Sequence, residues 1–201
     1  MKLQSSYYLN QDVLFLAKDL LGKVLFTQVD GEITAGIIVE TEAYFGIQDK
    51  ASHAYGGRRT NRTEIMYSEG GISYVYLCYG IHSMFNIVTS VKEEPHAILI
   101  RAVQPVVGEE IIERRRNMPV TKAAVSSGPG SVAKALGINL SFNKKDLGGD
   151  EIWIEDHNIH YPLDMIAAVP RVGIAYAEEY VLLPWRFFVK GNKYVSKPNK
   201  F

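Results

Sequence analysis

The chain has 201 residues, of which 47% are hydrophobic and 22% are charged, the composition of an ordinary soluble globular protein. This length predicts one domain spanning residues 1–201, large enough to bury a core. No apolar run reaches the roughly 18 residues that cross a bilayer, and the first residues lack the apolar stretch of a signal peptide. We therefore expect a cytoplasmic protein without a membrane partner.

The chain carries 22 basic and 22 acidic residues, a balance that counts against a nucleic-acid binder. The basic residues are nonetheless clustered. Clusters lie at Arg58, Arg59 and Arg62, at Arg114, Arg115 and Arg116, and in the run that holds Arg186, Lys190, Lys193, Lys197 and Lys200. A basic face would suit DNA bound through few phosphate contacts. Ordinary solvated charge is the alternative reading of each cluster.

Cys78 is the only cysteine, which excludes an intrachain disulfide and a cysteine metal cluster. It lies in an apolar run, so a core position is expected. The close histidine pair, His157 and His160, has no partner cluster, and no glycine-rich phosphate loop is present. The sequence therefore predicts no metal site and no cofactor.

The first predicted element is a helix capped by Asn10, with apolar positions along 13–21 and Gly22 as its stop. The Asp30-Gly31 pair predicts a tight hairpin turn. The other elements follow in chain order: strands 23–29, 33–42, 72–79, 83–90 and 97–103, helices 107–116 and 131–136, and strands 151–155 and 185–190. This order predicts an α+β domain with a mostly antiparallel β-sheet core and packed helices.

Two connections attract attention. Residues 45–71 form a polar, glycine-rich loop, and a loop that long inside a domain is usually functional. Strands 72–79 and 83–90 form a hairpin that protrudes, with its tip near Gly80, Ile81 and His82.

Two carboxylates, Glu40 and Glu42, lie two residues apart on the predicted strand 33–42 and so share one face if the strand stays regular. A carboxylate can orient and deprotonate a water that attacks an N-glycosidic bond. A solvent-facing or ion-paired glutamate is the ordinary alternative. The residues alone do not choose between the two.

Tyrosines surround this strand in the sequence. The flat faces of Tyr44 and Tyr76 would hold a planar base by stacking, better still when that base is positively charged. Tyr79 precedes Gly80 at the hairpin tip and is expected to protrude, where it could fill the gap left by a flipped nucleotide. Tyr76 and Tyr79 are an odd number apart, so a regular strand points them to opposite faces. Core packing is the alternative for each tyrosine.

The segments ETEAY, ASHAYGGR and the Y-G hairpin, all within 38–86, resemble the alkyladenine (3-methyladenine) DNA glycosylase family. The resemblance extends over nearly the whole chain, through SSGPGSVAKALGIN, PRVGIAYAEEY and PWRFFVKG. It implies a base-excision-repair enzyme that flips alkylated, and in some cases deaminated, purines out of duplex DNA and hydrolyses their N-glycosidic bond. It also selects the second glutamate, Glu42, as the water-activating base.

The resemblance implies a base pocket. Tyr44 and Tyr76 would lie on opposite sides of the flipped base, and His53 would bind its edge. Asn86 would lie at the pocket floor and crowd the exocyclic amino group of guanine. Arg101 would lie near the nucleotide backbone and the attacking water.

The resemblance also implies DNA contacts outside the pocket. Tyr79 would be the wedge, while Arg58, Arg62, Ile81 and His82 would touch the DNA backbone or the minor groove. The tip carries His82 where larger side chains also occur in the family. No lysine accompanies the glutamate, so a monofunctional enzyme without lyase activity is expected.

The expected partner is double-stranded DNA with damaged purines, bound by a monomer in the cytoplasm, at the nucleoid if the source is bacterial. Two alternatives come from other classes. One is a lesion-binding protein without catalysis, against which the retained Glu42 argues. The other is a hydrolase of free nucleosides, in which a protruding Tyr79 and the arginine clusters would have no role.

Overall fold

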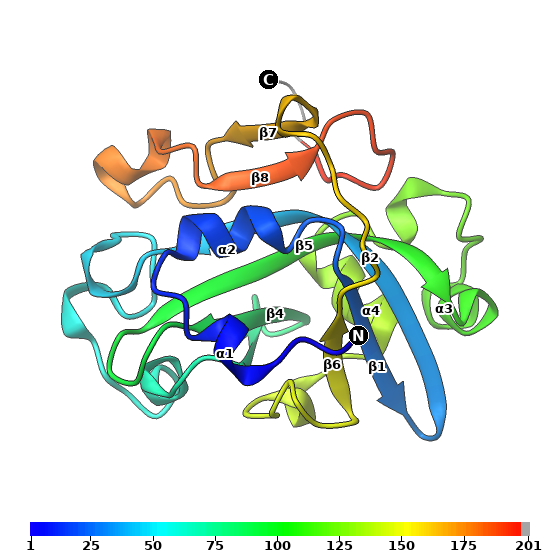
Figure 1. The fold of residues 1–201 in the computed structure, drawn as a ribbon, viewed down its shortest axis with the longest axis horizontal. Coiled ribbons are helices and arrows are strands. Elements are labelled where there is room, and N and C mark those ends of the chain that lie inside the picture. The colour runs from blue at the N-terminus through cyan, green and yellow to red at the C-terminus, as the bar shows by residue number, and fades with distance from the viewer. Residues whose placement is uncertain (198–201) are drawn as a thin grey trace.

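The two longest strands, β2 (Glu32–Tyr44) and β5 (His96–Val107), pair antiparallel through the middle of the computed structural model (Figure 1). The structure describes residues 1–197. Six strands follow the order β3-β4-β5-β2-β1-β6, β8 also pairs with β2, and β7 pairs with β8. The other strands are β1 (Val24–Val29), β3 (Ile72–Cys78), β4 (His82–Thr89), β6 (Ile152–Glu155), β7 (Ile166–Val169) and β8 (Arg186–Val189).

Among residues 1–197, four α-helices pack around this sheet, and α2 lies along β2 and β5 in Figure 1. They are α1 (Ser5–Tyr8), α2 (Val13–Asp19), α3 (Glu109–Arg116) and α4 (Pro129–Leu136). Short 3₁₀ helices occupy Gly46–Gln48, Tyr55–Gly57, Glu64–Tyr67, Ala123–Val125, Leu140–Phe142, Leu163–Met165 and Glu178–Leu182. Helix α4 packs on β4 and β5, and the main apolar core lies between the sheet and these helices. The described residues form the single α+β domain that the sequence predicts.

The predicted elements are present, with shifted ends and one different cap. The Asp12 side chain, not that of Asn10, caps α2 by accepting the Phe15 N–H at 2.9 Å. Asn10 instead accepts the N–H of Asp12, which shapes the turn before the helix. Both residue types suit an N-cap, so the sequence pattern does not separate the two.

The turn between β1 and β2 has the predicted form. Asp30 and Gly31 have φ values of 52° and 80°, the left-handed pair of a tight hairpin turn. Asn and Asp tolerate this region and glycine adopts it freely, which is why the dipeptide is a strong signal.

The tip of the β3–β4 hairpin lies one residue earlier than predicted. Cys78 pairs with His82, so the turn consists of Tyr79, Gly80 and Ile81, and His82 belongs to β4. Tyr79 has φ 52° and is 92% exposed, which confirms that it protrudes. Because Tyr79 lies in the turn, the strand-alternation argument does not apply to it, and its direction follows from the turn.

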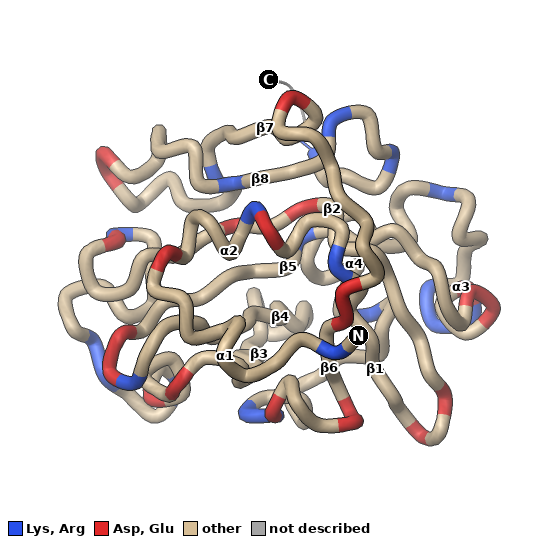
Figure 2. The backbone as a smooth tube through the Cα atoms, viewed as in Figure 1, with Lys and Arg blue, Asp and Glu red and all other residues tan. Residues whose placement is uncertain are grey.

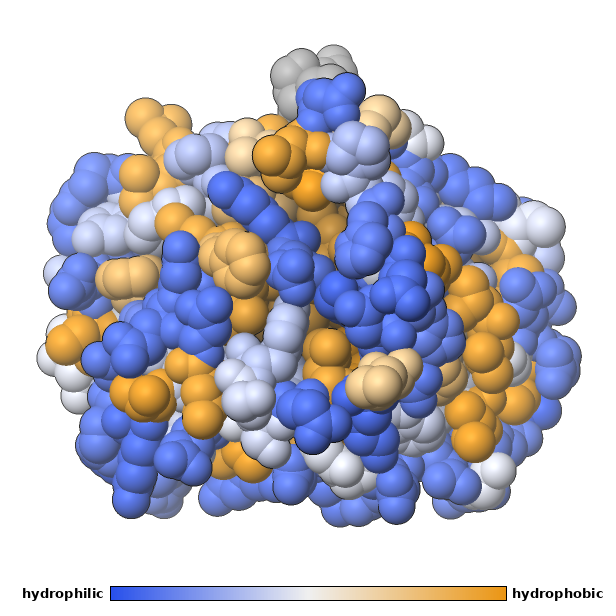
Figure 3. Space-filling view, viewed as in Figure 1, coloured by the Kyte–Doolittle hydropathy of each residue, from blue (hydrophilic) through white to orange (hydrophobic). Residues whose placement is uncertain are grey.

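Polar and apolar residues are mixed over the molecule. The face in Figure 3 is largely hydrophilic, with apolar side chains in separate areas, and acidic and basic segments lie interspersed in Figure 2. Much of the predicted basic clustering is neutralised: Arg59 pairs with Glu64 and Glu93, and Arg114 pairs with Glu32. Lys200 lies outside the described residues. The basic character of the surface therefore rests on fewer cations than the sequence predicts.

Candidate active site

A cleft of about 430 Å³ opens beside the β3–β4 hairpin, between the 45–71 loop and the segment 172–176. The structure brings seven predicted site residues into its lining: Tyr44, His53, Arg62, Tyr76, Tyr79, Asn86 and Arg101. Glu42 lies directly behind Tyr44 and Arg101. Ile81 and His82 line a neighbouring groove instead, and Arg58 is exposed on the loop and lines neither. Cys78 lines the cleft and is half-buried, so the expected core position was wrong.

The carboxylate of Glu42 is fully buried but tied to residues that face the cleft. Its Oε2 accepts the Tyr44 hydroxyl at 2.9 Å, and its Oε1 accepts the backbone N–H of Val172 at 2.7 Å. Nη1 of Arg101 lies 3.3 Å from the same Oε1. A carboxylate has about four acceptor positions, so one position on Oε2 stays available beyond these three contacts.

The carboxylate of Glu40 has a different environment. Its Oε1 accepts Nε of Arg101 at 2.9 Å, Nη1 of Arg186 at 3.2 Å and Oγ of Ser196 at 2.8 Å, and its Oε2 accepts the N–H of Ser196 at 2.7 Å. Three of these donors bind Oε1 and one binds Oε2, and of the residues that supply them only Arg101 lines the cleft. Glu40 therefore holds the fold together around β8, whereas the three partners of Glu42 all line the cleft.

Strand β2 is not regular between these glutamates. Its register against β5 shifts on both sides of Glu40, a bulge that the sequence pattern does not show. Both carboxylates nevertheless reach one guanidinium, that of Arg101, as a shared face predicts. Burial alone would lower the pKa of Arg101, but the charges of Glu42 and Glu40 raise it above its usual value.

His53 joins an aromatic and cationic cluster on one wall of the cleft. Its Nδ1 lies 2.8 Å from the Tyr74 hydroxyl, which also accepts Nε of Arg62 at 3.3 Å. The Arg62 guanidinium lies 4.6 Å from the ring centre of Tyr76. Burial, then the charges of Arg62 and Arg58, lower the pKa of His53 to about 4. The imidazole is therefore neutral at pH 7, with one nitrogen able to donate and one to accept.

Asn86 is fixed at the bottom of the cleft. Its Nδ2 donates to the carbonyl of Tyr74 at 3.1 Å and to that of Met84 at 3.3 Å. The side chain is buried, and both donors of its amide are directed to the backbone. The amide oxygen is then the group that Asn86 can offer to a neighbour.

Several residues of the site were not predicted. The buried Arg171 pairs with both oxygens of Asp49, at 2.5 and 2.8 Å, and donates to the carbonyl of Ala43 at 2.8 Å. This pair fixes the 45–71 loop and the segment after Arg171, whose next residue, Val172, donates to Glu42. Tyr176 lines the cleft, and its hydroxyl donates to the carbonyl of Ala51 at 3.3 Å. The only sequence signal for Arg171, Val172 and Tyr176 was their place in PRVGIAYAEEY, for which no role was predicted, and Asp49 had only its place in the 45–71 loop.

The described residues were also compared with the requirements of a metal site and of a membrane span. Within residues 1–197, no group of three or more His, Cys, Asp and Glu side chains is arranged to hold a metal ion. The helices described there are too short or too polar to span a membrane.

Tyr44 is protonated in this site. Burial, followed by the charge of Glu42, raises the pKa of Tyr44, so its hydroxyl stays protonated and donates to that carboxylate.

Comparison with known proteins gives a consistent answer. Residues 7–193 match the model of the methylpurine-DNA glycosylase family. A Chlamydia felis protein with the provisional name 3-methyladenine DNA glycosylase is 50% identical over 192 residues, 95% of this chain and 97% of its own length. Similarly named proteins of Bacillus cereus and Desulfitobacterium hafniense are 47% and 42% identical, with 98% of this chain covered in each case and 100% and 99% of their own lengths. The chain thus belongs to the methylpurine-DNA glycosylase family, whose members are DNA glycosylases of base excision repair.

Proposed function

We propose that this glycosylase flips an alkylated purine out of duplex DNA and hydrolyses its N-glycosidic bond with a water activated by Glu42. The observation that carries the proposal is the position of Glu42, buried behind the aromatic cleft with an acceptor position left on Oε2. Glu40 is bound instead by Arg186 and Ser196, which lie outside the lining of the cleft.

The reaction would proceed through a sugar with oxocarbenium character, because the bond to the base breaks as water attacks. The free position of Glu42 would orient that water and take its proton. Arg101, held in place by Glu40, would lie beside the same water. The fixed carboxylate would also stabilise the positive charge that develops on the sugar.

Recognition would depend on stacking and on shape. Tyr44 and Tyr76 would stack on the faces of the flipped base, and a methylated purine with a positive charge would stack best. Neutral His53 could donate to or accept from the base edge. The carbonyl oxygen and bulk of Asn86 would crowd a normal guanine. An unpaired or weakly paired damaged base would also flip at lower cost.

Tyr79 would fill the space that the flipped nucleotide leaves. The ring is 92% exposed at the end of the hairpin and Ile81 beside it is 74% exposed, both unusual for side chains of this size unless they contact a partner. A nucleoside hydrolase would gain nothing from this feature. A lesion-binding protein would gain nothing from a buried carboxylate beside the glycosidic bond.

We propose further that the enzyme is monofunctional. No lysine is among the described residues that line the cleft, so no amine is available there for a Schiff base. We also propose that it works as a monomer in the cytoplasm, on DNA, without a cofactor.

The test uses a duplex oligonucleotide with one hypoxanthine or ethenoadenine. The enzyme should release the free base and leave an abasic site that breaks only after alkaline treatment, and borohydride should trap no covalent complex. Strand cleavage without alkali, or a trapped complex, would contradict the monofunctional mechanism. Release of base from free nucleosides at a similar rate would favour the nucleoside hydrolase.

A further inference from the structure

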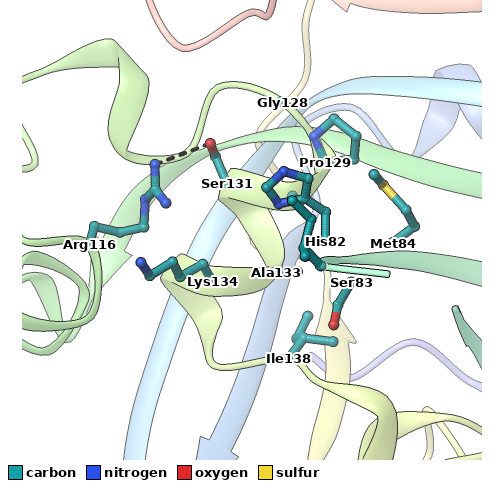
Figure 4. A pocket seen from close by; sticks show the side chains of 12 residues that line it. His82, Ser83, Met84, Arg116, Gly128, Pro129, Ser131, Ala133, Lys134 and Ile138 are labelled. Carbon is teal, nitrogen blue, oxygen red and sulfur yellow. Dashed lines mark hydrogen bonds between the residues drawn. The ribbon is translucent and has the colours of Figure 1, made fainter. Parts of the chain in front are cut away.

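A second groove, of about 580 Å³, lies between the start of β4 and helix α4. It shares Met84 and Pro129 with the cleft, so the two hollows adjoin on either side of the hairpin. Figure 4 shows Arg116 and Lys134 extending along one side of it, with the ring of His82 across from them. The residues that line it include no aspartate or glutamate.

Arg116 is held rigidly without a carboxylate. Its Nε donates to the carbonyl of Val125 at 2.7 Å, and its Nη2 donates to the carbonyl of Ala124 at 2.9 Å and to Oγ of Ser131 at 3.2 Å. These acceptors are neutral, so the positive charge of the half-buried guanidinium is not compensated. A fixed, partly desolvated guanidinium of this kind binds anions well because its geometry is already set.

Most of the other arginines, unlike Arg116, lie within ion-pair distance of a carboxylate. The arginines with a carboxylate oxygen within ion-pair distance are Arg59, Arg101, Arg114, Arg115, Arg171 and Arg186. Among residues 1–197, the arginines for which no such partner is found are Arg58, Arg62 and Arg116. Arg58 and Arg62 lie on the loop at one side of the Tyr79 hairpin, and Arg116 lies in the groove at the other. Uncompensated guanidinium charge therefore flanks the wedge on both sides.

Lys134 adds a second cation to the groove. It lies three residues after Ser131 on α4, and residues at this spacing share a helix face. Its ammonium is exposed and forms no hydrogen bond or ion pair with the part of the chain that the structure describes. Two cations on one side of a groove repel each other unless an anion lies between or beside them.

We propose that this groove binds a backbone phosphate of the DNA duplex outside the flipped nucleotide, with Lys134 and Arg116 as its cationic ligands. The inference rests on the proposed function, because a duplex seated on Tyr79 passes beside the groove. A phosphodiester supplies the anion that the lining lacks. The contact fixes the position of the duplex without reading its sequence.

The test compares Lys134→Gln with Lys18→Gln, a matched charge removal on α2 that lines neither hollow. Binding of undamaged duplex is measured between about 0.1 and 1 M salt. Loss of one phosphate contact should reduce the slope of log affinity against log salt by about 0.9 in Lys134→Gln, which is about eightfold weaker binding at about 0.1 M salt. Lys18→Gln should keep the wild-type slope.

A second measurement locates the phosphate. Single phosphates of the duplex are replaced by neutral methylphosphonates. One replacement should weaken binding of the wild type but not of Lys134→Gln, since the contact is already absent there. The inference would be overturned by equal slopes for all three proteins or by equal losses in both variants. It would also be overturned if, at every position tested, the methylphosphonate weakened binding of Lys134→Gln as much as binding of the wild type.

Failure of the phosphate contact can be told apart from failure of the proposed function. Undamaged duplex is bound without excision, so a wild type that fails to release damaged bases would remove the proposed function without altering the salt slopes. Lys134 is preferred to Arg116 for the test because the bonds of Arg116 also hold the turn at Ala124 and Val125. Thermal unfolding of each variant checks that the fold is kept.

Discussion

Nη1 of Arg101 lies 3.3 Å from Oε1 of Glu42, while Nε of the same guanidinium donates to Glu40 at 2.9 Å. One side chain thus links the proposed general base to a carboxylate whose other partners, Arg186 and Ser196, lie outside the lining of the cleft. The two glutamates lie two residues apart and are both fully buried. The two glutamates differ in the groups that surround them, so their substitutions are expected to have different effects.

Glu40→Gln should destabilise the fold. The change leaves Arg101 and Arg186 buried with one negative partner fewer, and breaking a buried ion pair typically costs about 3–5 kcal/mol. Urea unfolding of the variant and of Glu151→Gln, which removes an exposed pair with Lys145, measures the difference. The exposed change should cost less than about 1 kcal/mol. A cost that small for Glu40→Gln would mean that its contacts are not structural.

Lowering the pH should weaken the fold through His53. Its pKa is about 4 in the folded chain and near 6.5 in the unfolded chain, so the unfolded chain binds the proton first. Stability is then lost as pH falls from about 6.5 towards about 4, by up to about 1.4 kcal/mol per pH unit. Unfolding free energies at several pH values should show a shallower dependence in His53→Gln. Identical pH profiles would show that the histidine titrates normally.

Local patterns predicted those parts of the site that local geometry fixes. Alternation along a strand placed Glu40 and Glu42 on one face, where both reach Arg101, and a tyrosine before a glycine marked the exposed tip. Contacts between distant segments left no such signal. Val172 reaches Glu42, and Arg171 reaches Asp49, across more than a hundred residues, and only the packed fold shows these contacts.

The smallest elements were missed for a related reason. Helix α1 and strand β7 have four residues each, too few for a period to be visible. The bulge at Glu40 likewise has no signal in the local sequence, since it arises in the pairing of β2 with β5. Charge clusters in the sequence were also a weak guide, because Arg59 and Arg114 find carboxylate partners from other segments.

The salt dependence of binding should be modest. With zero net charge and few unpaired cations, about four to six phosphate contacts give a slope of roughly −4 to −5 for undamaged duplex. Fluorescence anisotropy over a salt series measures it. A slope near −10 would reveal a much larger basic footprint.

Tyr79→Ser should impair flipping more than chemistry. Unstacking a base costs a few kcal/mol, and the wedge offsets part of that cost. Excision should therefore fall most for a well-stacked lesion in duplex, such as ethenoadenine opposite thymine, and less for the same lesion in single strand. Tyr76→Ser, which removes a wall of the cleft, should weaken excision in both. Equal losses for Tyr79→Ser in the two substrates would assign Tyr79 a packing role.

Glu42→Gln is the sharpest test of whether Glu42 activates the attacking water. Glutamine keeps the shape and can still accept from Tyr44 or Val172, but it cannot take a proton. Under single-turnover conditions with enzyme in excess, excision of the defined lesion should fall by at least about 10²–10⁴, while binding to the same duplex persists. Near-normal excision by Glu42→Gln, with the loss found instead in a folded Glu40→Gln, would show that Glu42 is not the base.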